Sequence, residues 1–156
     1  MKFTIPTLFS LALLPQLSFA LPAFKNYPAA PFTGKYKAIK IDRSNQLYKS
    51  FLTELKNEKI NFAGKYVLSP IGCGGGCSNI AFYNAQNGHA GYFKQSFSDC
   101  YSEKHGFQMN DYEYQANSQL LIAMGRRSEK IEQCEKVYYL MKNDRLVEIA
   151  HHPVWK

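Results

Sequence analysis

Hydrophobic and polar residues change their spacing once along the chain. From Asp42 to Lys59 the apolar residues Leu47, Phe51 and Leu55 recur at every fourth position, with lysines and glutamates between them. This is the spacing of one face of an amphipathic helix. After Asn61 the apolar residues come in short runs, rich in β-branched and aromatic side chains and separated by turn residues, which is typical of strands. One helix followed by β-structure is therefore expected.

Seven short runs after the helix have the composition of strands. Two pairs of turn residues, Asn87-Gly88 and Asn143-Asp144, tolerate the backbone of tight hairpin turns, so neighbouring runs should pair in antiparallel fashion. The pattern predicts an α+β, mainly β fold in which one N-terminal amphipathic helix packs on an antiparallel β-meander of about six or seven strands. A short strand, Tyr36–Ile41, should precede the helix, and the predicted strands after it are Lys65–Ser69, Asn79–Tyr83, His89–Phe93, Tyr112–Gln115, Gln119–Met124, Val137–Met141 and Arg145–Ile149.

The first twenty residues have the pattern of a secretory signal peptide. Lys2 gives a positive start, Ile5 to Leu14 is apolar, and Ser18-Phe19-Ala20 places small residues where a signal peptidase cleaves. An uncleaved anchor is the weaker alternative, because a membrane span needs about 20 apolar residues and prolines interrupt this run. We expect residues 1–20 to be removed, and residues 21–156 to form a single β-rich domain in the periplasm or outside the cell.

Four cysteines, Cys73, Cys77, Cys100 and Cys134, lie in the mature chain. An even number of cysteines in an exported protein indicates disulfide bonds, for which three pairings are possible. Local proximity within the Gly72–Cys77 loop favours a Cys73–Cys77 bond, which leaves the other two cysteines to pair. Chain-closure entropy predicts a contribution of about 2 kcal/mol from the short loop and about 4 kcal/mol from the long one.

Three functional interpretations of the glycine-rich loop compete with a simple disulfide turn. The amides of Gly74, Gly75 and Gly76 suit an anion-binding nest, but the Lys and Ser/Thr of a phosphate-binding loop are missing. Four thiolates suit zinc, but a second close pair of cysteines is missing. A reactive cysteine is usually found at a helix start or in a Cys-x-x-Cys pair, and the loop has neither. We therefore expect no metal site, no cofactor and no catalytic residue.

Other side chains suggest binding more than chemistry. No histidine falls in a metalloprotease motif, and no Gly-x-Ser-x-Gly elbow occurs. Without Lys2, 18 lysines and arginines stand against 12 acidic residues, spread along the chain with only Arg126-Arg127 locally concentrated. That basic tip suits an acidic or phosphate-bearing partner but lacks the density of a nucleic-acid domain. The many tyrosines fit either a recognition surface or a core filled with rings.

Four segments occur in a distinctive order: Asn61-Phe62-Ala63-Gly64-Lys65-Tyr66, the Gly72–Cys77 loop, the Asn84–Gly88 turn and Asn117-Ser118-Gln119-Leu120-Leu121. In them the chain resembles a group of small exported proteobacterial proteins of uncharacterised function, which have an N-F-A-G-[HK]-Y strand, a G-C-G-x-G-C loop, a D-x-x-T-G turn and a D-S-x-L-L strand. It departs from that group at Asn84 and Asn87, where the group carries Asp and Thr, and at Ile71, where an aromatic residue often stands. The resemblance implies an envelope location and a β-rich fold, and it supplies no catalytic residue.

These observations favour a non-enzymatic binding domain, an inhibitor or immunity-like protein that acts on a cell-wall-directed hydrolase. Its partner would be another envelope or secreted protein, and not nucleic acid. Two alternatives stay open, namely an enzyme with an unrecognised site near the Gly-Cys loop and a structural envelope component held to anionic surfaces. The candidate binding residues are Gly74, Gly75, Gly76, Arg126 and Arg127.

Overall fold

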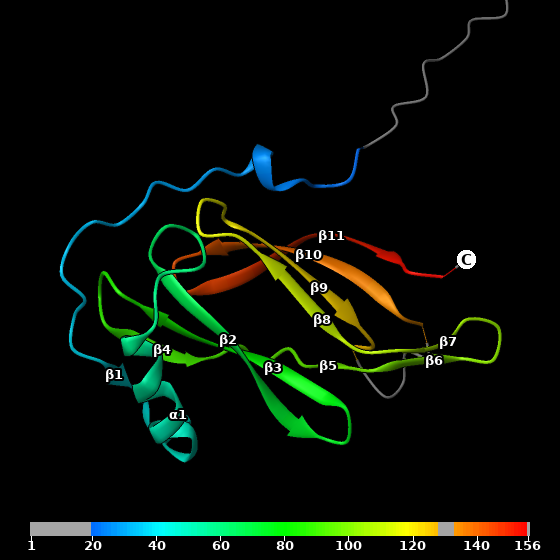
Figure 1. Cartoon of the computed structure of the whole chain (residues 1–156), viewed down its shortest axis with the longest axis horizontal. Helices are drawn as coiled ribbons and strands as arrows, with labels where there is room; N and C mark the ends of the chain where they lie inside the picture. Colours follow the sequence, from blue (N-terminus) through cyan, green and yellow to red (C-terminus); the bar gives the residue numbers. More distant parts are fainter. Residues whose placement is uncertain (1–19, 128–132, 156) are drawn as a thin grey trace, which may run out of the picture.

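Two β-sheets pack face to face in the computed structural model (Figure 1), which describes residues 20–127 and 133–155. The first sheet has the strand order β1-β4-β3-β2, with β5 also paired to β3, and the second has the order β11-β10-β9-β8. A two-stranded hairpin, β6–β7, projects from one end of the molecule. The strands are β1 (Lys40–Ile41), β2 (Tyr66–Gly74), β3 (Cys77–Asn84), β4 (His89–Tyr92), β5 (Phe97–Ser98), β6 (Cys100–Ser102), β7 (Gly106–Gln108), β8 (Asp111–Tyr114), β9 (Leu120–Gly125), β10 (Glu135–Lys142) and β11 (Arg145–Pro153).

Side chains at successive positions of β3 belong to different parts of the core. Ile80 and Phe82 pack between the two sheets, together with Tyr139 of β10. Tyr83 lies on the other face of β3, where it packs in one cluster with Leu52 of the helical segment. Because successive strand residues point to opposite faces, a strand covered on both sides is apolar throughout. The fold therefore has three layers, in the order helical segment, first sheet and second sheet.

The position of the helix differs from the prediction. Helical structure does span most of Asp42–Lys59, but it lies after β1 and a long lead-in instead of at the N-terminus, and it consists of three short pieces, η2 (Arg43–Tyr48), α1 (Lys49–Glu54) and η3 (Leu55–Asn57). A further 3-10 turn, η1 (Phe24–Asn26), lies in the lead-in. Because a 3-10 helix has three residues per turn, a four-residue apolar repeat drifts off its face. Leu47 of η2 is accordingly 86% exposed, whereas Leu52 of α1 is buried.

The number and arrangement of the strands also correct the prediction. All seven strands expected after the helix are present, but the described residues form eleven strands in all. β5, β6 and β7 were missed because strands of two or three residues are too short to show an alternating pattern. The strands do not form one meander either, since β1 pairs with β4 in parallel and β5 returns to pair with β3.

The proline-rich lead-in, residues 20–33, lies along the outer face of the second sheet. Phe24 and Tyr27 pack in one cluster with Leu120 of β9. The Ser118 hydroxyl lies 3.0 Å from the carbonyl oxygens of both Phe24 and Tyr27. The lead-in thus covers apolar surface that the second sheet would otherwise expose.

Gly64 marks the place where the lead-in passes closest to the body of the protein. Its carbonyl oxygen accepts a hydrogen bond of 2.7 Å from the Phe32 amide, and its φ is 72°. A Cβ atom at this position would lie 1.9 Å from the carbonyl oxygen of Ala30. Only glycine therefore allows this crossing without moving the backbone.

Both disulfide bonds have the predicted pairing, Cys73–Cys77 and Cys100–Cys134. The first closes the tip of the β2–β3 hairpin, and the second joins the start of β6 to the residue before β10. Within residues 20–127 and 133–155, no helix has the length and apolar character needed to cross a membrane.

Candidate functional site

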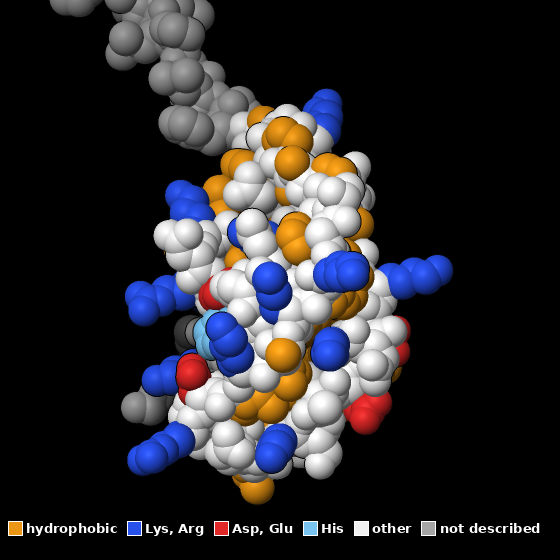
Figure 2. All heavy atoms as spheres, turned by 90° about the vertical axis from the view of Figure 1, so that its left-hand side faces the viewer, with side chains coloured by type: hydrophobic (Ala, Val, Ile, Leu, Met, Phe, Trp, Pro, Cys, Tyr) orange, Lys and Arg blue, Asp and Glu red, His pale blue; other side chains and the backbone are white. Residues whose placement is uncertain are grey.

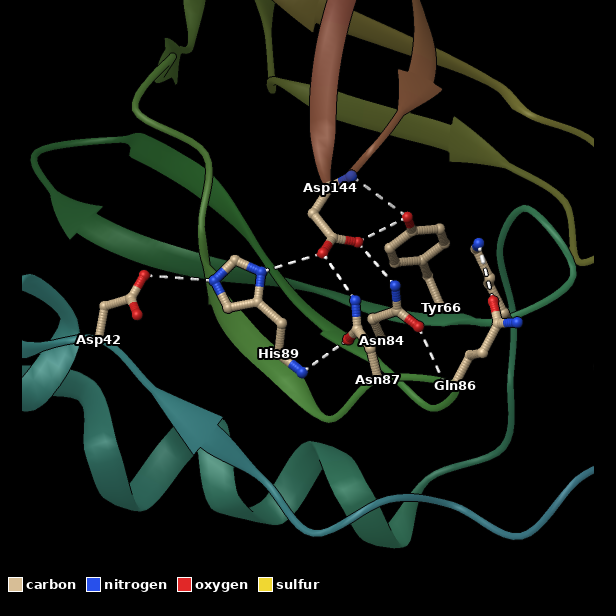
Figure 3. A network of polar contacts seen from close by, with 8 residues as sticks. Asp42, Tyr66, Asn84, Gln86, Asn87, His89 and Asp144 are labelled. Atoms are coloured by element: carbon tan, nitrogen blue, oxygen red, sulfur yellow. Dashed lines mark hydrogen bonds and ion pairs between the residues drawn. The ribbon is translucent and has the colours of Figure 1, made fainter.

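A cluster of polar side chains lies around Asp144, where the β10–β11 turn meets the first sheet (Figure 3). Asn143 and Asp144 form this turn with φ values of 51° and 58°. Asparagine and aspartate are the residues besides glycine that most readily adopt this left-handed backbone. The hairpin predicted at Asn143-Asp144 is confirmed, and it directs the Asp144 carboxylate toward β2 and β3.

Four side chains of the first sheet and its turns contact the Asp144 carboxylate. The Tyr66 hydroxyl and the Asn84 Nδ2 each donate to Oδ1 at 2.7 Å. The Asn87 Nδ2 donates to Oδ2 at 3.0 Å, and His89 Nδ1 lies 3.1 Å from the same oxygen. Each carboxylate oxygen therefore has two partners, as the dashed lines in Figure 3 show.

These contacts set the charge of the cluster. Burial alone would raise the pKa of Asp144, but the hydrogen bonds from Tyr66, Asn84, Asn87 and His89 outweigh it and hold the pKa below its usual 3.8. Burial, the hydrogen bond to Asp144 and repulsion by that carboxylate raise the pKa of Tyr66. At neutral pH the pair is thus an ionised acceptor and a neutral phenol donor.

The His89 ring is held between two carboxylates. Its Nε2 lies 3.3 Å from Asp42 Oδ2, while Nδ1 faces Asp144, so each ring nitrogen is occupied by a carboxylate contact. The ring packs edge-on to Phe82, with 5.2 Å between the ring centroids. It borders a cleft of about 800 Å³ whose walls also include Tyr139.

The Asp144 cluster is best described as a clamp between the sheets. Tyr66 and Asn84 belong to the first sheet and Asp144 to the turn of the second, so every bond of the carboxylate crosses from one sheet to the other. In the part of the chain that the structure describes, no three His, Cys, Asp or Glu residues are placed to hold a metal ion. The cluster also lies at the opposite end of β3 from the Gly-Cys loop, near which an enzyme site had been considered.

The Gly-Cys loop has the backbone that its glycines predict. The φ values of Gly74, Gly75 and Gly76 are 93°, 56° and 74°, all in the region that side chains disfavour. The Gly76 carbonyl oxygen accepts hydrogen bonds from the Asp99 amide at 2.9 Å and from Asn110 Nδ2 at 2.8 Å. A Cβ atom on Gly76 would lie 2.5 Å from Asp99 Oδ2. A carboxylate therefore lies against the loop, which disfavours an anion there.

The structure separates the two arginines of the predicted basic tip. Arg127 forms ion pairs of 2.7 Å through Nε with Glu135 and through Nη1 with Glu148, and its side chain is 18% exposed. Arg126 pairs through its backbone with Ser98 and borders a depression next to the β6–β7 hairpin. Lys130, which follows these arginines in the sequence, lies outside the described residues.

The β6–β7 hairpin is the feature that sequence reasoning missed. Tyr101 is 71% exposed, Phe107 63% and Met109 69%. Tyr101 and Phe107 stand directly opposite each other in the hairpin and share one face, and Met109 follows directly after β7. No strand is predicted between Phe93 and Tyr112. The only signal in the sequence is the alternation of Phe107, Gln108 and Met109, which is too short to predict a strand.

No known family model, characterised protein or solved structure matches this chain. The resemblance to small exported proteins remains a prediction, and the residues that carry it have structural roles. Asn61 exchanges two hydrogen bonds with the backbone of Leu68, at 2.9 and 2.8 Å. Tyr66 and Asn84 bind Asp144. The function has to be inferred from the geometry of the surface.

Proposed function

We propose that this protein is a non-enzymatic binding domain of the cell envelope, which acts as an inhibitor or immunity-like protein by occupying a groove of a cell-wall-directed hydrolase. The observation that carries the proposal is the exposed apolar face of the β6–β7 hairpin. Large apolar side chains that gather on a soluble surface usually mark an interaction site. The hairpin is therefore the element that would enter the partner.

The side chains on the hairpin are of the kinds that dominate protein interfaces. Tyr101 and Phe107 bring large contact areas with little side-chain entropy to lose. Met109 adds a flexible apolar side chain that adapts to an irregular surface. The exposed charged residues Glu103 and Lys104 lie in the turn of the hairpin. An apolar centre with a polar rim is the common composition of a binding surface.

The hairpin is held rigidly by contacts at both of its ends. At its base, Cys100 and Cys134 are each 2% exposed and pack with Met124. At its turn, the His105 ring stacks on Trp155, with centroids 5.5 Å apart and planes inclined by 15°. A loop that is already ordered loses less conformational entropy when it binds. This rigidity supports a role in tight binding.

A depression of about 490 Å³ lies beside the hairpin and extends the candidate surface. Its walls include Tyr101, Arg126 and Trp155. Arg126, proposed from the sequence as a binding residue, thus lies next to the hairpin that the sequence did not identify. An acidic side chain of the partner that enters the depression would meet the guanidinium of Arg126. The surface therefore combines apolar anchors with one positive charge.

The envelope location rests on two further observations. Residues 1–20 have the pattern of a signal peptide. Two disulfide bonds are typical of proteins that fold in an oxidising compartment.

A peptidoglycan digestion assay tests the proposal. The protein is added to a panel of muramidases, amidases and endopeptidases, and the release of soluble wall fragments is followed. We expect at least one hydrolase to be slowed, and the Tyr101→Ser/Phe107→Ser variant to lose affinity for it by about 100-fold or more, as expected for interface hot spots. Leu47→Ser, which changes an exposed side chain in the helical segment, is the matched control and should inhibit as the parent does.

Two results would overturn the proposal. One is that the parent protein neither binds nor slows any hydrolase of the panel. The other is that the Tyr101→Ser/Phe107→Ser variant inhibits as strongly as the parent, because the hairpin would then not be the binding element.

A further inference from the structure

We infer that the N-terminal side of the molecule is a lysine-rich docking surface for an anionic phospholipid bilayer. Residues 25–65 contain nine lysines and arginines but only three acidic residues, Asp42, Glu54 and Glu58. Residues 66–156 contain nine lysines and arginines and nine acidic residues. The whole positive excess of the mature chain therefore comes from its first third, a segmental pattern that a count over the whole chain conceals.

The fold gathers these residues on one side of the protein. The lead-in crosses the top of Figure 1, the chain from its end to the helical segment follows the left-hand side, and the β6–β7 hairpin projects at the right. Figure 2 turns the left-hand side to the viewer and shows Lys and Arg side chains across it, with few acidic side chains among them. We call the exposed cations of residues 25–65 the basic face.

The charges of the basic face are not neutralised within the protein. Among the described residues none of them takes part in an ion pair, whereas Arg127 and Lys136 elsewhere do. Unpaired cations that share one surface produce a field that attracts anionic partners from a distance. The exposed members are Lys25, Lys35, Lys37, Lys40, Arg43, Lys49, Lys56 and Lys59.

An exposed aliphatic side chain on this face favours a bilayer over other anionic partners. Leu47 is 86% exposed and lies in the chain between Arg43 and Lys49. Apolar side chains among lysines are typical of surfaces that insert into the headgroup region of anionic membranes.

The composition of the basic face argues against nucleic acid. Eight of the nine cations of residues 25–65 are lysines. Lysine acts as a hydrated point charge, whereas nucleic-acid sites favour the planar fork of arginine together with aromatic stacking. The inference rests on these charges and on Leu47, so it does not depend on the hydrolase proposal.

Vesicle co-sedimentation tests the inference. The protein is mixed with vesicles of phosphatidylglycerol and phosphatidylcholine in equal parts, and with vesicles of phosphatidylcholine alone. We expect binding to the first and not to the second, and release by high salt. The Lys40→Gln/Lys49→Gln variant should bind about 25-fold more weakly, since each lysine near an anionic surface contributes about fivefold.

A matched control distinguishes the contribution of the basic face to vesicle binding from that of net charge. Lys104→Gln/Lys136→Gln removes two lysines outside the face, one in the β6–β7 turn and one in β10, and should change binding by less than about threefold. Leu47→Ser should weaken binding by about tenfold if the side chain enters the bilayer. Variants are compared only when they melt at the parent's temperature, and Lys56→Gln/Lys59→Gln replaces the first pair if that pair does not.

Three outcomes would overturn the inference. Equal binding to both kinds of vesicle would exclude a headgroup-directed surface. Equal losses in the test pair and in the control pair would show that only net charge matters. Unchanged binding by Leu47→Ser, together with tighter binding to a single-stranded RNA oligonucleotide, would assign the basic face to polyanions of another class.

Discussion

The β2–β3 and β6–β7 hairpins both project from the body of the protein, and each contains at least one cysteine of a disulfide bond. In β2–β3 the bond lies at the tip, between Cys73 and Cys77. In β6–β7 it lies at the base, where Cys100 is joined to Cys134 next to the second sheet. A bond at the tip fixes only the turn, whereas a bond at the base fixes the whole hairpin against the body and leaves its tip available for contact.

The base of β2–β3 is held in a different way. Tyr66 and Asn84 face each other across its first rung, and both bind the Asp144 carboxylate. One hairpin is therefore anchored by an ionised carboxylate and the other by a covalent bond. The first anchor should be sensitive to acid and the second to reductant.

The largest effect should come from removing the basal disulfide. Cys100→Ser/Cys134→Ser should lower the free energy of unfolding by about 4 kcal/mol, because the unfolded chain regains the freedom of a long loop. Urea denaturation of the variant and the parent measures the difference. If this loss of stability is no larger than the loss caused by removing the tip disulfide, the distinction between a bond at the base and a bond at the tip is wrong.

Removing the charged anchor should have the next largest effect. Asp144→Asn keeps the size of the side chain but presents an amide group to two of the four donors, which should cost about 3 kcal/mol at pH 7. Because the folded pKa of Asp144 is lowered, its contribution is present above its unfolded pKa and is lost as the pH falls through the folded value. The gap between parent and variant should therefore close below about pH 4.

Urea denaturation at several pH values tests the charged anchor. Glu58→Gln, which changes an exposed carboxylate, serves as control and should follow the parent at every pH. A gap between the parent and Asp144→Asn that stays constant from pH 7 to strong acid would contradict the role of the ionised carboxylate.

The tip disulfide should contribute less than either anchor. Cys73→Ser/Cys77→Ser should cost about 2 kcal/mol, since the closed loop is short. Hydrogen exchange should show faster exchange only at the β2–β3 tip, while the amides of the β6–β7 hairpin stay as protected as in the parent. Faster exchange in both hairpins would show that they are coupled.

The smallest predicted effect is a difference in stability between alanine substitutions at two glycines of the β2–β3 tip. Gly75→Ala should cost about 1 kcal/mol, because its φ is positive but its surroundings are open. Gly76→Ala should cost about 1 kcal/mol more, since the added carbon must also displace the Asp99 side chain. Thermal unfolding resolves a difference of this size, and equal melting temperatures would show that Asp99 moves freely.

Local patterns predicted the framework but not its assembly. Residue type alone predicts the positive φ values at Asn143-Asp144 and at the glycines of the Gly72–Cys77 loop. Runs of apolar, β-branched and aromatic residues identified the long strands, because strands such as β3 are covered on both faces. The two-sheet arrangement and the parallel pairing of β1 depend on contacts between distant segments, which no local pattern contains.

The candidate sites show the same limit. Compartment and spacing favoured a Cys73–Cys77 bond among three possible pairings, and the structure has that pairing. The Asp144 cluster unites residues from three strands and two turns, and Tyr66 and Asp144 are 78 positions apart, so its members look unremarkable one at a time. Arg127 seemed a free charge because its partners, Glu135 and Glu148, lie on neighbouring strands that only the fold brings together.

The lead-in of residues 20–33 has a consequence for the order of folding. Its contacts with Ser118 span up to 94 positions, so the lead-in must wait until β9 exists before it can dock. Contacts of such long sequence separation form slowly. We therefore expect docking of the lead-in to be a late step, during which the apolar outer face of β9 is briefly uncovered. Changes at this end of the chain should act on the rate of folding and on aggregation as much as on final stability.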